Sequence, residues 1–191
     1  MTAHTTGPAL EVGVAPTEGT WIAAVDVAYG ATRSVAACVV FEDWSAPAAM
    51  REHVVFSSSA APYVPGRFFE RELPYVLRVL AELPRSPQCL VVDGFVWLED
   101  ERPGLGGHAW NALGQKVVVV GVAKTAFKSA SHCVPVTRGA SKSPLYVTAA
   151  GAPVEEAADW VRRMHGEHRT PTLLRRVDQL SRELATPMVE R

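Results

Sequence analysis

Two short apolar runs, each with one aspartate, stand out in the pattern of hydrophobic and polar positions. Residues 21–30 are apolar almost throughout, are rich in β-branched side chains and end in turn signals, which is typical of a strand buried on both faces. Asp26 lies in the middle of this run, and a similar run over residues 89–94 ends with Asp93. Because a buried carboxylate is costly unless cations or hydrogen-bond donors meet it, we expect Asp26 to be either hydrogen-bonded or a metal ligand.

The remaining periodic segments predict a mixed order of strands and helices. Further strands are expected over residues 34–41, 52–57, 117–123 and 144–148, and helices over about 71–80 and 105–113 and from about 153 and 170. The first two strands should pair antiparallel, and the run 117–123 should be a buried parallel strand with Lys124 at its carboxyl end. We expect a loop over residues 125–143. A mixed sheet flanked by helices fits this order, and it is the α/β arrangement of ribonuclease H-like folds.

Length and composition favour one domain with a core large enough to be stable without disulfide bonds. The chain has 191 residues, of which 48% are hydrophobic, and its three cysteines form no metal-binding or disulfide pattern. We expect a flexible tail over residues 1–20 and a single domain over 21–191. No apolar stretch reaches the ~18 residues of a membrane span, and the start lacks the order of a secretion signal. The protein is therefore expected to be cytoplasmic, without a membrane partner, and we favour a monomer.

The charges are unevenly distributed along the chain. Residues 1–115 carry 7 basic and 13 acidic side chains, whereas residues 116–191 carry 12 basic and 7 acidic ones. The segment 116–154 holds five basic residues and no Asp or Glu. Unopposed cations gain by releasing counterions from a polyanion, so this segment either faces phosphates or is a solvated loop.

Seven segments, in order, resemble the endonuclease V family. They are residues 25–29, 62–66 followed by Arg71, Glu72 and Pro74, 91–94, Gly104 and Leu105 with His108, 121–125, 144–147, and a last group of Arg169, Pro171, Arg175 and Asp178. The resemblance implies a nuclease that depends on Mg²⁺, or on Mn²⁺ in its place. Its partner would be DNA or RNA containing deaminated adenine (hypoxanthine or inosine), cut on the 3′ side of the lesion.

The resemblance also implies roles for individual residues. Asp26, Glu72 and Asp93 match the three metal-binding carboxylates of the family, and such hard oxygen ligands suit Mg²⁺. Lys124 matches a lysine suited to the scissile phosphate or to orienting the nucleophile. These four residues form the expected catalytic set.

Two further features would bind the substrate. Pro62, Tyr63, Val64 and Pro65 resemble the family's wedge, a stiff apolar tip that fills the gap left by a flipped-out base. Gly94 would let a base approach the backbone closely.

Each of these residues also has an ordinary structural interpretation. Asp93 before glycine suits a turn, and Glu72 suits a solvated first turn of a helix. Tyr63 suits a loop anchor, and Lys124 a surface charge. His108, beside alanines on a predicted helix, is expected to be a partly buried histidine outside the catalytic set.

The chain departs from the family pattern near its end. Residues 148–154 contain neither the histidine nor the arginine of the family's Gly-His-Arg motif, and Glu155 or Glu156 is a candidate to replace the missing histidine as a ligand. These departures keep two other hypotheses open. The first is a family member that has lost its chemistry and binds nucleic acid or protein. The second is a metal-dependent hydrolase with another substrate, since a fold does not determine the substrate.

Overall fold

The structure is a computed structural model that describes residues 19–57, 68–99, 102–127 and 132–186. Its elements, in chain order, are β1 (Ile22–Tyr29), β2 (Ser34–Phe41), β3 (Arg51–Ser57), α1 (Phe68–Ala81), β4 (Cys89–Asp93), β5 (Trp97–Glu99), β6 (Arg102–Pro103), α2 (Leu105–Ala112), β7 (Val118–Ala123), β8 (Val134–Val136), β9 (Leu145–Ala150), α3 (Val154–Arg163) and α4 (Thr172–Ala185). Seven strands form one sheet in the order β3-β2-β1-β4-β7-β9-β8, and β5 and β6 form a separate small hairpin.

The centre of the sheet is parallel and its flanks are antiparallel. β4 pairs parallel with both β1 and β7, while β2, β3, β8 and β9 pair antiparallel with their neighbours. Parallel strands deliver their carboxyl ends to the same edge of a sheet. Asp93 and Lys124, at or just beyond the ends of β4 and β7, therefore meet at one edge.

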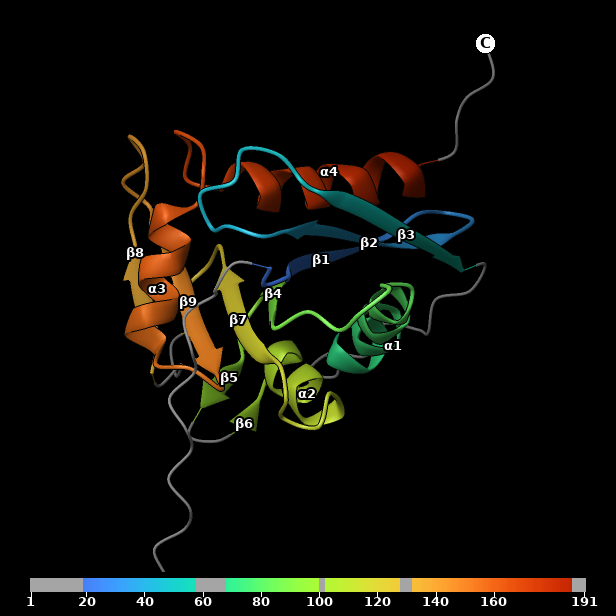
Figure 1. Ribbon diagram of the computed structural model, residues 1–191, viewed down its shortest axis with the longest axis horizontal. Helices are drawn as coiled ribbons and strands as arrows, with labels where there is room; N and C mark the ends of the chain where they lie inside the picture. Colours follow the sequence, from blue (N-terminus) through green and yellow to red (C-terminus); the bar gives the residue numbers. More distant parts are fainter. Residues whose placement is uncertain (1–18, 58–67, 100–101, 128–131, 187–191) are drawn as a thin grey trace, which may run out of the picture.

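Helices cover both faces of the sheet (Figure 1). α3 and α4 pack on one face around Trp160, Val161, Val177 and Leu180, and α1 and α2 pack on the other face around Val76, Val79 and Ala109. Residues of β1 alternate between the two cores, with Ile22 and Ala24 on the α3/α4 side and Ala23 and Val25 on the α1/α2 side. The strand period of two thus places Asp26 on the side of α4.

The fold confirms the predicted mixed α/β sheet flanked by helices and the parallel strand before Lys124. Three predictions are wrong in detail. β8 lies within the expected loop 125–143, because a three-residue strand is too short to show a period. The β5–β6 hairpin was not expected for the same reason. α1 begins at Phe68 rather than near residue 71, since Phe69 stacks on His108 of α2 at 3.5 Å between ring centroids, so Pro74 lies inside the helix.

Some predictions fall on residues outside the described ranges. These are most of the tail 1–20 and the whole wedge, Pro62, Tyr63, Val64 and Pro65. Among the helices that the structure describes, none combines the length and apolar character needed to cross a membrane.

Candidate metal and nucleic-acid site

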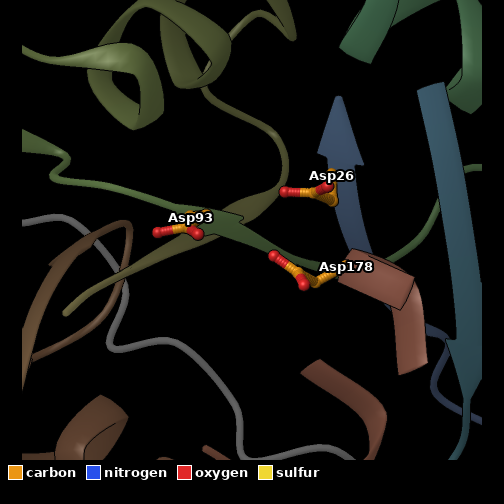
Figure 2. Close-up of side chains that lie close together, drawn as sticks. All are labelled: Asp26, Asp93 and Asp178. Atoms are coloured by element: carbon orange, nitrogen blue, oxygen red, sulfur yellow. The ribbon is translucent and has the colours of Figure 1, made fainter. Parts of the chain in front are cut away.

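Three carboxylates from three different elements meet at the edge where β4 ends (Figure 2). They belong to Asp26 in β1, Asp93 at the end of β4 and Asp178 in α4, and one oxygen of each lies within 4.8 Å of those of the other two. α4 reaches them because Leu173, Val177 and Leu180 pack into the sheet and hold the helix across β1. Within the described part of the chain, this is the only group of three or more acidic, histidine or cysteine side chains close enough for one ion.

A lysine lies against this cluster. The Lys124 Nζ donates to Asp93 Oδ2 at 2.9 Å and lies 3.6 Å from Asp178 Oδ1. Partial burial lowers the pKa of Lys124, but the hydrogen bond to Asp93 and the charges of the three aspartates outweigh it, so the pKa lies above its usual value. Lys124 is therefore a cation at neutral pH.

Asp26 is held by a buried serine of α4. The Ser181 hydroxyl, which is fully buried, donates to Asp26 Oδ2. Burial raises the pKa of Asp26, and the neighbouring charges of Asp178 and Asp93 raise it further, although the bond from Ser181 and the charge of Lys124 act in the opposite direction. Burial and like charges thus disfavour the Asp26 carboxylate, and a cation at this place would stabilise it.

Glu72 enters the same cavity from α1. It is only 8% exposed, so the interpretation of a solvated glutamate is wrong. Burial, together with the charges of Asp26 and Asp93, raises its pKa to about 8. Glu72, Asp26, Asp93, Asp178 and Gly94 all line one open cavity of about 510 Å³. Glu72 is not within the 4.8 Å group, so the structure brings two of the three predicted carboxylates together and places the third on the wall of their cavity.

The donor set suits a hard divalent cation. Oxygens that share one Mg²⁺ at about 2.1 Å lie at most about 4.2 Å apart, so a small inward movement of Asp26, Asp93 and Asp178 brings their oxygens to one ion. Carboxylates without nitrogen or sulfur ligands favour Mg²⁺ or Mn²⁺ over softer ions. The raised pKa values of Asp26 and Glu72 fit this assignment, because a cation offsets the repulsion that contributes to raising them.

An apolar cleft adjoins the acidic cavity and shares Asp93 and Gly94 with it. Its volume is about 610 Å³, and aromatic and aliphatic side chains dominate its wall, including Phe69, Phe95 and Phe127. Gly94, at φ +128°, forms the junction. A β-carbon would meet no atom within 4 Å there, but the backbone conformation is one that other residues rarely adopt. The site therefore combines a charged half and an apolar half on either side of one glycine.

Sequence reasoning missed Asp178 and Ser181. Asp178 belongs to the segments that carry the resemblance, which was the available signal, but its helix reads as an ordinary amphipathic one with a polar outer face. Glu155 and Glu156, considered as replacement ligands, do not join the cluster. The basic segment 116–154 is not a phosphate-facing surface as a whole. Arg138 is only 7% exposed and donates to main-chain oxygens, including that of His168 at 3.0 Å.

The fold and the site together define a ribonuclease H-like α/β protein with an acidic cluster at the carboxyl edge of its sheet. The family model for Endonuclease V matches residues 11–152. The chain belongs to the endonuclease V family.

Relatives support the family at the level of sequence. The chain is 38% identical over 146 residues to Endonuclease V of Streptomyces coelicolor. The match covers 76% of this chain and 59% of that protein. It is 38% identical over 107 residues to Endonuclease V of Azotobacter vinelandii, covering 54% of this chain and 46% of that protein. The chain thus spans about half of the length of these curated relatives.

Solved structures support the fold. Endonuclease V of Streptomyces avermitilis is 26% identical with a TM-score of 0.71, covering 92% of this chain and 86% of that one. Human ENDOV is 23% identical with a TM-score of 0.69, and the match covers 87% of this chain and 84% of that one. Endonuclease V of Ciona intestinalis was solved in complex with a 24mer DNA containing an inosine. It is 18% identical with a TM-score of 0.70, and the match covers 86% of this chain and 85% of that one.

Proposed function

We propose that this protein is a divergent metal-dependent endonuclease that cuts a phosphodiester bond on the 3′ side of a deaminated purine in DNA or RNA. The observation that carries the proposal is the convergence of Asp26, Asp93 and Asp178 beside Lys124. Membership in the endonuclease V family supports the reaction class, and the inosine-containing DNA bound by the Ciona protein supports the substrate class.

The acidic half of the site would hold Mg²⁺ or Mn²⁺ through Asp26, Asp93 and Asp178, with Glu72 on the cavity wall as a further acceptor. When bound, such an ion supplies positive charge to phosphate oxygens and lowers the pKa of water. Lys124 remains protonated beside Asp93 and offers an ammonium donor to a phosphate oxygen. Glu72, whose pKa is raised mainly by burial, lines the same cavity.

The apolar half of the site would receive the base. A flipped nucleobase needs stacking surfaces and a close backbone approach, and the cleft offers Phe69, Phe95 and Phe127 with Gly94 at its junction to the acidic cavity. This arrangement would set the base in the cleft while its neighbouring phosphate reaches the carboxylates. The wedge proposed at Pro62, Tyr63, Val64 and Pro65 remains a sequence-based prediction.

A cleavage assay tests the proposal. End-labelled DNA and RNA oligonucleotides with one inosine, and matched oligonucleotides with adenosine, are incubated with the protein in Mg²⁺, Mn²⁺ or EDTA. We expect metal-dependent cleavage of an inosine strand at one position, reduced at least about 10³-fold by Asp93→Asn. Asp159→Asn, an exposed aspartate paired with Arg162 on α3, serves as the matched control.

A binding protein without chemistry is the second candidate, favoured by the absence of the family's histidine and arginine from residues 148–154. Inosine-selective binding with no cleavage in any metal would support this candidate and refute the nuclease. Binding without preference for inosine would refute the lesion specificity.

A further inference from the structure

Arg182 lies one helical turn after Asp178 on α4 and lines the acidic cavity. Its guanidinium donates to Asp178 Oδ1 at 2.9 Å, and its side chain is 69% exposed. Among the described residues that line this cavity, Arg182 is the only basic one, facing the carboxylates of Glu72, Asp26, Asp93 and Asp178. A polyanion approaching this cavity therefore meets Arg182 at its wall, in addition to Lys124, which lies against Asp93 and Asp178.

The ion pair of Arg182 competes with a metal ion for one oxygen. Lys124 and Arg182 both face Oδ1 of Asp178, at 3.6 Å and 2.9 Å. Lys124 pairs with both Asp93 and Asp178, whereas the ion pair of Arg182 is with Asp178. The pair with Arg182 is an exposed i,i+4 pair, which is weak and easily broken.

We propose that Arg182 is a phosphate-binding residue that Asp178 holds in the metal-free protein and releases when a divalent cation binds. This inference rests on the proposed function. Once a divalent cation takes Asp178, the guanidinium loses its partner and lies beside the acidic cavity, where its planar donors match two phosphate oxygens. Nucleic-acid binding then follows metal binding, because the same carboxylate serves either the arginine or the ion.

Two measurements on the full chain test this proposal without relying on cleavage. In the first, Mn²⁺ is titrated into protein alone. Arg182→Gln removes the competing cation, so its dissociation constant for Mn²⁺ should be at least about two-fold lower than that of the wild type. In the second, an inosine-containing single strand is titrated in Ca²⁺, with the strand checked to remain intact. There Arg182→Gln should bind about 5–10-fold more weakly, and the slope of log K against log salt should fall by about 0.7.

The same titration in EDTA should show little difference between wild type and Arg182→Gln, since Asp178 then occupies the guanidinium. Arg162→Gln is the matched control, because Arg162 forms an exposed pair with Asp159 on α3. It should behave as the wild type in all three titrations.

Three results would overturn the proposal. Weaker Mn²⁺ binding by Arg182→Gln would mean that Arg182 only orients Asp178. Unchanged strand affinity and salt slope in Ca²⁺ would refute the phosphate contact. A wild type that binds no strand at all would refute the proposed function as well, and in that case the Mn²⁺ titration still decides whether Asp178 releases Arg182.

Discussion

The Ser181 hydroxyl determines where the Asp26 carboxylate can lie. Ser181 is fully buried on the side of α4 that faces β1, and its uncharged hydroxyl donates to Asp26. Partners of this kind orient metal ligands, and their loss typically weakens metal binding by about 10-fold or more. We therefore expect Ser181→Ala to raise the dissociation constant for Mn²⁺ about 10-fold.

Calorimetric titration of Mn²⁺ measures this effect. Thr186→Ala is the matched control, because Thr186 also bonds to α4, through the Arg182 carbonyl, but lies at the exposed end of the helix. Equal Mn²⁺ affinities for Ser181→Ala and the wild type would show that Asp26 needs no help from α4.

The raised pKa of Glu72 predicts that the stability of the protein in EDTA depends on pH. The pKa of about 8 in the folded state lies above the usual value of 4.5, so the folded state binds more protons than the unfolded state between these pH values. The free energy of unfolding should therefore fall as pH rises from about 5 to 8, by an amount on the order of a few kcal/mol. Urea unfolding in EDTA at several pH values measures this slope.

Glu72→Gln should flatten that slope, because glutamine does not titrate. Glu52→Gln is the control, since Glu52 forms an exposed pair with Arg176 away from the site. A slope of the same size in Glu72→Gln would assign the pH dependence to other groups.

At the scale of elements, the contact between β4 and β7 fixes the end of β4 where Asp93 lies. Gly121 of β7 pairs with Val92, and a β-carbon on it would meet the Gly94 oxygen at 2.6 Å, Thr148 Oγ1 at 2.7 Å and the Val96 nitrogen at 2.8 Å. The main chain cannot give way here without moving Gly94. We expect Gly121→Ala to lower the free energy of unfolding by about 1–3 kcal/mol and to reduce cleavage and Mn²⁺ affinity as well.

Val119→Ala, on the same strand, separates the two effects. Val119 is fully buried in the α1/α2 core, so its truncation should destabilise by a similar amount while leaving Mn²⁺ affinity intact. If both variants lost stability but kept wild-type Mn²⁺ affinity, the packing of Gly121 would have no bearing on Asp93.

The elements also show how far the sequence leads. β1 and β4 were predictable because each is an apolar run with a single carboxylate. The parallel pairing of these two strands, which brings Asp26 beside Asp93, does not follow from either run. The burial of Glu72 was not predictable, since it depends on how α1 packs against the end of the sheet. The place of Asp178 in the site was not predictable either, because it depends on α4 crossing β1. This brings together Asp26 and Asp178, which are 152 positions apart, and no local sequence pattern encodes such a contact.

At the scale of the whole molecule, carboxylates that repel one another are held close together at one edge of the sheet. Four carboxylates line one cavity, and Lys124 and Arg182 offset only part of their charge. A ligand that binds only the folded state stabilises it by RT ln(1 + [L]/Kd), about 2.7 kcal/mol at 100 times Kd. For a chain of this length that corresponds to a rise in Tm of roughly 5–10 °C in saturating Mg²⁺ or Mn²⁺.

The variant Asp178→Asn links this stabilisation to the cluster. An amide keeps the shape of the side chain but lacks the charge that attracts a cation, so the rise in Tm on adding metal should drop to less than half of the wild-type value. Asp159→Asn on α3 should retain the full rise, since Asp159 pairs with Arg162 away from the cavity. An equal rise in Tm for the wild type and Asp178→Asn would place the ion elsewhere. The carboxylates at the edge of the sheet would then lie close together without a bound cation to offset their repulsion.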